Sequence, residues 1–362
     1  MKQIKKLIQK ILSWAPARMT LRQINLILLA FGSLNRVTSF IYSLIFFIPF
    51  SREQHANIKG KYLYYRNQKK PLVTRAELRR NIHRLEKAMI MRPRRDHFAT
   101  NYISETVGVY RKAADQLMHG ESPIDHEEVA WAQHVLEEYF ATVKVGNTTI
   151  DRARSDFDSI PDSVKITGRK VPYASKDRVE ASVSYEDFLA LCNRRRSVRW
   201  FLDKKVPREI IDDALMAARQ SPSACNRLPY EFRVFDDPKL VRKVAGLPFG
   251  TAGYSQNIPV VAVVVGKLEN YFSSRDRHAI YVDSALAAMP FMLALETKGV
   301  STSVINWPDF EPLEMKMQKM LGLNVSDRPI MLIAIGYADP SGRIPFSQKK
   351  ELDTIRSYNR TT

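Results

Sequence analysis

Cysteine and acidic side chains are scarce in this sequence. Two of its 362 residues are cysteine, which excludes a disulfide-stabilised scaffold and a four-cysteine zinc site and indicates a reducing compartment. Residues 1–100 hold 21 Lys and Arg but four Asp and Glu. The seven histidines lack the spacing of a metalloprotease or a zinc finger, so we expect no metal site. There is no internal repeat or low-complexity tract, which excludes a solenoid or a fibrous chain.

The positive charge is concentrated at one end of the chain. Residues 1–100 carry +17 of the total +18, so the rest is nearly neutral. A cationic block of this kind is typical of chains that bind nucleic acid or an anionic membrane surface. No helix-turn-helix, zinc finger or aromatic-rich RNA-binding motif is present. We therefore expect an anionic membrane surface as a partner of residues 1–50, and no nucleic acid.

Residues 1–50 form a cationic segment that alternates with apolar runs. It has seven basic residues and no acidic ones. The apolar runs 24–31 and 37–50 are shorter than the roughly 20 residues that a spanning helix needs. An element lying in the membrane interface fits best, with an apolar helix pair packed on the protein's own body and a true span as alternatives. One face of the first helix is apolar, formed by Ile4, Leu7, Ile8, Ile11 and Trp14.

The rest of the chain divides into three parts. Residues 51–145 have helical periodicity and predict a helical N-terminal domain, and the polar stretch 146–183 predicts a linker or arm. From residue 184 to 362, strands and helices alternate in an α+β pattern. The expected strands are 230–235, 260–265, 300–306 and 330–335, with a long helix over about 279–298.

Two motifs in the last part are suited to ligand binding. The helix from Ser184 ends in Arg-Arg-Arg-Ser-Val-Arg at 194–199, where guanidinium groups can converge on a phosphate, although a solvated helix end is an alternative reading. The loop 221–230, Ser-Pro-Ser-Ala-Cys-Asn-Arg-Leu-Pro-Tyr, has small residues that let a flat ligand approach the backbone. Cys225 within it is expected to be a small filler rather than a reactive thiol.

Together, in this order and spacing, the two motifs resemble the FMN-dependent nitroreductase family over about residues 184–350. The resemblance implies a nitroreductase-like FMN-binding fold, a mixed central sheet flanked by helices in an intertwined homodimer, here preceded by an all-helical N-terminal region. It implies FMN as cofactor and NADH or NADPH as co-substrate. The matching cofactor-binding positions are Arg195, Arg196, Ser197, Arg199, Pro222, Ser223, Ala224, Asn226, Val304, Ile305 and Asn306.

The resemblance also implies the chemistry. A hydride passes from NAD(P)H through flavin N5 to an electron-poor acceptor, and backbone near Asn306 and Trp307 contacts N5, so no catalytic side chain is needed. The segment 81–91 is similar to one found upstream of this domain in bacterial members from surface-polysaccharide gene clusters. We therefore expect a membrane-associated enzyme peripheral to the inner, cytoplasmic face. The alternative is a non-catalytic flavin-fold scaffold or accessory protein of a membrane polysaccharide machine.

Three features depart from the family pattern. Leu228 stands where many relatives have Gln, which removes one polar contact to the flavin. Asn306-Trp307 replaces an acidic-glycine pair seen in some members, and Trp307 is expected to crowd or reshape the acceptor slot. The C-terminal basic ligands of the phosphate have no clear match, since Phe346 and Gln348 occupy the closest positions and Lys349 and Lys350 lie nearby.

Overall fold

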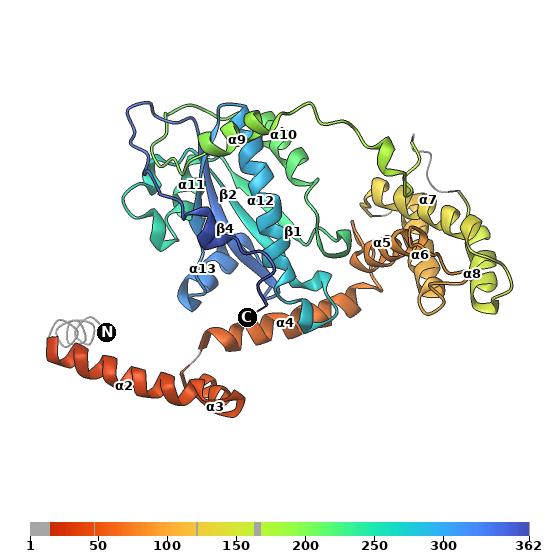
Figure 1. Ribbon diagram of the computed structural model, residues 1–362, viewed down its shortest axis with the longest axis horizontal. Helices are drawn as coiled ribbons and strands as arrows, with labels where there is room; N and C mark the ends of the chain where they lie inside the picture. Colours follow the sequence, from red (N-terminus) through yellow and green to blue (C-terminus); the bar gives the residue numbers. More distant parts are fainter. Residues whose placement is uncertain (1–14, 47, 121, 163–167, 362) are drawn as a thin grey trace.

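The computed structural model describes residues 15–46, 48–120, 122–162 and 168–361. Figure 1 shows three parts along the chain: an N-terminal helical hairpin followed by a long helix, a bundle of helices, and a domain built on a sheet. The apolar face expected on residues 4–14 lies outside the described residues.

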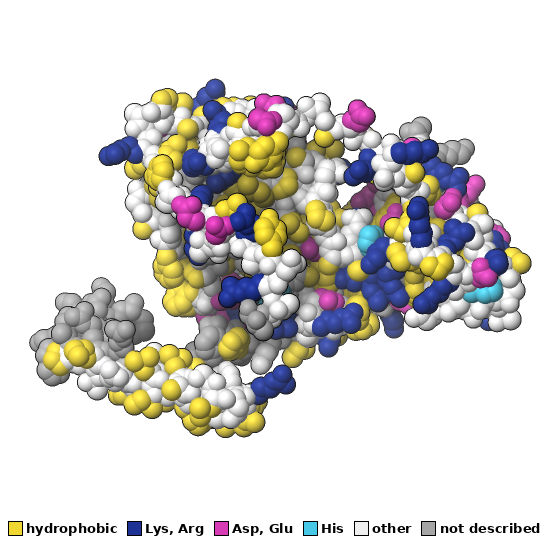
Figure 2. Space-filling model, viewed as in Figure 1, with side chains coloured by type: hydrophobic (Ala, Val, Ile, Leu, Met, Phe, Trp, Pro, Cys, Tyr) yellow, Lys and Arg dark blue, Asp and Glu magenta, His cyan; other side chains and the backbone are white. Residues whose placement is uncertain are grey.

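The hairpin consists of α2 (Ala15–Ser33) and α3 (Arg36–Phe46). The two helices meet closely at Gly32, where a Cβ would lie 3.0 Å from the ring of Tyr42. Its large apolar side chains are exposed, and Figure 2 shows them along its length. The alternative in which these helices pack on the protein's own body therefore does not hold for the described residues of the hairpin.

The helical module comprises α5 (Ala76–Met89), α6 (Ile103–His119), α7 (His126–Thr142) and α8 (Thr148–Asp158). Its apolar faces enclose one core, in which Leu78, Ile82, Leu85 and Leu136 are fully buried. The structure differs here from the predicted linker 146–183, because α8 buries its own side chains in this core. The polar composition of this segment did not indicate a helix, because α8 buries only Ile150 and Ala153.

Helix α4 (Ile48–Asn67) does not belong to the module's core, in contrast to the predicted boundary at residue 51. It packs on the short helix η5 (Leu268–Asn270) of the sheet domain. Ala56 is fully buried there, and at Gly60 a Cβ would lie 2.8 Å from that of Leu268. A small residue at each of these positions allows the close approach.

The sheet domain spans residues 184–361 and has four antiparallel strands in the order β1-β2-β4-β3. Its strands are β1 (Tyr230–Phe235), β2 (Val260–Lys267), β3 (Ser301–Asn306) and β4 (Asp327–Gly336). The described strand pairs are all antiparallel, and the parallel part of the expected mixed sheet is limited to an isolated bridge between Ser197 and Thr302. Its helices are α9 (Tyr185–Arg194), α10 (Arg208–Ala218), α11 (Pro238–Ala245), α12 (Ala279–Thr297), α13 (Glu311–Leu321) and α14 (Leu352–Ile355).

Strand β2 is buried on both faces, which explains its unbroken apolar sequence. Val261 and Val263 face the core under α11 and α13, whereas Ala262 and Val264 face the core under α10 and α12. The segment 274–297, which includes α12, is the one described helix long and apolar enough to cross a membrane. Since α12 buries Phe291 and Leu295 against the sheet, its apolar composition is explained by the core.

Candidate functional site

The arginine turn (residues 195–199) follows α9 and is anchored to β3. Ser197 bridges to Thr302, and the backbone N–H of Val198 donates to the carbonyl of Thr302 at 3.0 Å. The Arg199 guanidinium lies 5.8 Å from the ring centre of Tyr254. These contacts hold the turn beside the first residues of an edge strand.

Buried donors at this turn have no partner among the described residues. They are Nε of Arg195 and the hydroxyl of Thr302, whereas the hydroxyl of Ser303, also unpartnered, lies on the opposite face of β3. Buried polar groups are normally hydrogen-bonded, so Arg195 Nε and the Thr302 hydroxyl indicate a ligand with acceptor atoms at the turn. A phosphate or a polar ring edge would satisfy them. Arg194, by contrast, is engaged in an ion pair with Glu296 at 3.1 Å.

Strand β3 presents the next predicted site residues. Val304 is 40% exposed and Asn306 is also exposed, whereas Ile305 is buried in the core. Because β3 is at the edge of the sheet, its outer backbone groups beyond Thr302 have no strand partner in the described part of the chain. Backbone N–H groups at such an edge can donate to a flat heterocycle.

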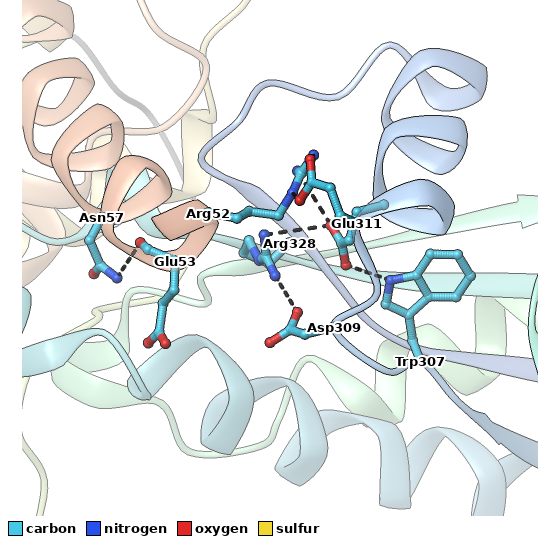
Figure 3. A network of polar contacts seen from close by, with 8 residues as sticks. Arg52, Glu53, Asn57, Trp307, Asp309, Glu311 and Arg328 are labelled. Carbon is cyan, nitrogen blue, oxygen red and sulfur yellow. Dashed lines mark hydrogen bonds and ion pairs between the residues drawn. The ribbon is translucent and has the colours of Figure 1, made fainter. Parts of the chain in front are cut away.

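Trp307 is placed differently from the sequence expectation. Its side chain is 6% exposed and lies in the core with Leu313 and Met317. Its Nε1 donates to Oε1 of Glu314 at 2.7 Å (Figure 3). The indole therefore does not crowd the surface beside β3, because a buried hydrogen-bond acceptor draws it inward.

The loop 221–230 has unusual backbone geometry. Cys225, Asn226 and Leu228 have positive φ angles of 55, 52 and 47°, which are uncommon for residues other than glycine. The Ser223 hydroxyl oxygen accepts from the backbone N–H of Leu228 at 3.0 Å. Strained backbone of this kind persists only where the surroundings hold it in place.

Two residues that the sequence analysis missed hold this loop. Asp283 of α12 accepts from the N–H of Ala224 and from the Tyr271 hydroxyl, both at 3.0 Å. Burial raises the pKa of Asp283, and these two hydrogen bonds oppose the rise. From the helical module, Nε of Arg79 donates to the carbonyl of Asn226 at 2.6 Å. No local sequence pattern signals either contact.

The structure does not bring the arginine turn and the loop together within one chain. Thr302, beside the turn, pairs with Ile335 of β4. Ile335 in turn pairs with Val260 at the start of β2, so these three residues lie at the same height in the sheet. The loop leads into Tyr230, which pairs with Gly266 near the other end of β2. At about 3.3 Å per residue these levels are about 20 Å apart.

One face of the sheet domain is apolar and exposed. Helix α9 has no buried residue, and α12 presents an outward apolar row of Val282, Leu286 and Met289. Figure 2 shows hydrophobic side chains gathered on this side of the sheet domain. The C-terminal segment, with Phe346 exposed, runs over the surface without burying its side chains.

A cavity of about 690 Å³ separates the loop from the N-terminal helices. Tyr64 of α4 and Glu77 of α5 line it on one side, and Leu228 and Tyr230 on the other. Leu228 thus faces this cavity rather than the arginine turn. Within the described ranges no three His, Cys, Asp or Glu side chains are grouped so as to hold a metal ion.

Comparison with known proteins identifies the sheet domain. Residues 193–256 and 251–337 match the nitroreductase family model. Iodotyrosine deiodinase 1 of Pongo abelii is 22% identical over 67% of this chain and 92% of its own, and iodotyrosine deiodinase of Haliscomenobacter hydrossis is 24% identical over 50% and 93%. An FMN-dependent nitroreductase from Clostridium difficile R20291 aligns with 48% of this chain and 99% of its own at 20% identity and a TM-score of 0.41. Residues 193–337, which carry both motifs and the sheet, therefore form a nitroreductase family domain.

Proposed function

We propose that this protein is an FMN-dependent oxidoreductase that transfers a hydride from NADH or NADPH to an electron-poor acceptor. The observation that carries the proposal is the set of unpartnered buried donors at the arginine turn, inside the part of the chain that matches the nitroreductase family. They form a site for an anionic, flat ligand with acceptor atoms. FMN has both properties.

The residues fit FMN in distinct roles. Arg195, Arg196 and Arg199 supply guanidinium groups, and Ser197 a hydroxyl, for the phosphate and the ring edge. Bound FMN supplies the two-electron chemistry, so the protein's part is to bind, orient and exclude water. The edge of β3 near Asn306 contributes backbone N–H groups toward the ring.

A homodimer completes this site. Because the two halves lie about 20 Å apart along the sheet of one chain, the loop with Pro222, Ser223, Ala224 and Asn226 would contact the flavin held by the partner's arginine turn. The exposed apolar row on α12 is the surface that such a partner would cover.

Two acceptor classes follow from the comparisons and the sequence. The relatives named iodotyrosine deiodinase favour reductive dehalogenation of an aromatic ring as a reaction to assay. An acceptor from surface-polysaccharide biosynthesis stays a prediction of the sequence resemblance. The same reduced flavin would serve either acceptor.

Flavin absorbance tests the proposal most directly. The purified or FMN-reconstituted protein should be yellow, and Arg195→Ala with Arg199→Ala should weaken FMN binding at least about tenfold by removing two charged contacts. Arg208→Ala is the matched control, because Arg208 lies on the surface and pairs with Asp236. A wild-type protein that takes up no FMN would instead support the scaffold function.

We also propose that the hairpin α2–α3 associates with the cytoplasmic face of an anionic membrane. Its side chains Ile27 and Leu44 are 68% and 70% exposed, and residues 1–50 contain no acidic residue. The full chain should float with vesicles of phosphatidylcholine and phosphatidylglycerol, and Ile27→Glu with Leu44→Glu should abolish flotation. Val179→Glu, at a position 97% exposed outside the hairpin, is the control. Equal flotation of all three proteins would contradict the proposal.

A further inference from the structure

The start of α4 is tied to the sheet domain by charged side chains (Figure 3). Arg52 donates two hydrogen bonds to Glu311 of α13, from Nε to Oε2 at 2.5 Å and from Nη2 to Oε1 at 2.7 Å. Its Nη1 lies 3.7 Å from Oε2 of Glu314, almost one turn further along α13. Two-pronged contacts between arginine and carboxylate are strong and directional. They fix α13 relative to α4.

Glu314 connects this contact to the end of β3. Its carboxylate is 2% exposed, accepts from Trp307 Nε1 at 2.7 Å and lies 3.5 Å from Nη1 of Arg328. Arg328 is also buried and pairs with Asp309. Burial raises the pKa of Glu314, and Arg328, Trp307 and Arg52 oppose that rise. Moving one partner away from Glu314 would leave a buried charge uncompensated, which is costly. The arrangement of these side chains is therefore expected to be stable.

Trp307 carries the constraint to the proposed flavin site. Its ring is packed in the core, and its N–H is held by Glu314. With both parts of the side chain fixed, the backbone of Trp307 and of the preceding Asn306 has little freedom. This is the backbone that the family resemblance places against the reactive edge of the flavin.

Helix α4 is a rigid support for this arrangement. At Gly60 the helix backbone approaches Leu268 so closely that no side chain fits without displacement. Glu53 lies 3.7 Å from Nε of Arg277, which adds a second polar contact at the same end of α4. A helix held both at its first turns and at Gly60 is expected to fix the position of Arg52.

We propose that Arg52 and Glu314 are positioning residues of the flavin site, through which α4 sets the backbone of Asn306 and Trp307. The inference rests on the proposed function, since it concerns the same site. Neither residue contacts the flavin or the acceptor. A reacting geometry displaced by about 1 Å can slow a reaction about 100-fold, so a smaller displacement is expected to cost about tenfold.

The test compares full-length, FMN-loaded variants by stopped-flow reduction with NADH and with NADPH. Arg52→Met removes both hydrogen bonds and keeps an unbranched side chain, whereas Arg52→Lys keeps the charge. Arg208→Met is the control, because Arg208 makes the same two-pronged contact with Asp236 at 2.7 and 2.9 Å on the domain surface. Arg52→Met should lower the limiting reduction rate about tenfold, with FMN affinity and the half-saturating donor concentration within about twofold. Arg52→Lys keeps the charge but loses the two-pronged geometry, so it should restore the rate only in part.

The possible results separate this inference from the proposed function. A wild-type protein without FMN overturns both. FMN-loaded Arg52→Met that reacts as fast as Arg208→Met overturns the positioning role alone. If neither nicotinamide reduces the wild type, the reduction potential of bound FMN is compared instead, and it should shift in Arg52→Met but not in Arg208→Met. If Arg52→Met does not fold, Trp307→Phe keeps an aromatic ring and removes the indole N–H, and an unchanged rate or potential in that variant overturns the inference.

Discussion

The helical module and the sheet domain each bury an apolar core of their own, but they pair their buried carboxyl groups differently. In the sheet domain, Glu314 lies near two arginines, Arg52 and Arg328. In the helical module, another carboxyl group, that of Glu105, helps to raise the pKa of Glu77. Nearby arginines favour the charged form of a carboxyl group, whereas a neighbouring carboxyl group favours the protonated form. We therefore expect Glu77 and Glu105 to give the module a pH dependence of its own.

The two regions meet through a few polar contacts and share no core cluster among the described residues. Arg79 spans this boundary, since it binds both Glu128 of the module and the carbonyl of Asn226 in the site loop. The comparison thus predicts two folding units with separate stabilities, connected at the loop 221–230.

The largest expected effect separates the two cores. Leu85→Ala in α5 and Leu295→Ala in α12 each remove a fully buried leucine, so each should cost about 2–5 kcal/mol in free energy of unfolding. Calorimetry should show two transitions, with Leu85→Ala lowering the transition of the module and Leu295→Ala that of the sheet domain. Leu26→Ala on α2, where the side chain is exposed, is the control and should change neither. A single transition lowered equally by both variants would contradict separate folding units.

The next effect is the pH dependence that Glu77 gives to the module. Burial, together with Glu105, raises the pKa of Glu77 from 4.5 to about 8. Folding therefore takes up a proton between these values, so this contribution is complete below pH 4.5 and is lost as pH rises through about 8. The melting temperature of the module should fall between pH 5 and pH 8 in the wild type and less so in Glu77→Gln. At pH 8, Glu77→Gln should have a free energy of unfolding higher than that of the wild type. Because Glu105 is exposed and water screens the pair, we expect a difference of about 2 kcal/mol.

Glu105→Gln is the matched variant for this pair. It removes the like charge and leaves the burial of Glu77, so it should reduce the pH dependence partly rather than fully. An equally steep pH dependence in Glu77→Gln and in the wild type would show that another group titrates.

The sheet domain was largely predictable from its sequence because its signals are local. The apolar run of β2, the cap of α9 by Ser184 and the length of α12 each depend on neighbouring residues. The order of the two motifs indicated a family that residues 193–337 then matched.

The contacts that complete the site could not be read in this way. Arg79 and Asn226 are 147 residues apart, and periodicity says nothing about such pairs. The Trp307 side chain points inward because it donates to Glu314, which also lies near Arg328 of β4. These contacts arise from tertiary packing, which a local sequence pattern does not reveal. Helix α8 was missed because its polar residues outnumber the two apolar ones that it buries.

The smallest expected effect concerns the contact that joins the two regions. Arg79→Lys keeps a positive charge beside Glu128 but removes the Nε donor to the Asn226 carbonyl, which should cost about 1 kcal/mol. Because Asn226 has a positive φ, the loop should relax without this donor, and FMN affinity should fall about threefold. Fluorescence titration with FMN measures the affinity, and calorimetry should show the module's own transition within about 0.5 kcal/mol of wild type. Arg84→Lys is the control, since Arg84 lies on the same helix against Tyr102 and does not touch the loop in any described contact. Equal FMN affinity in Arg79→Lys and Arg84→Lys would mean that Asp283 alone holds the loop, and the module would then be independent of the flavin site.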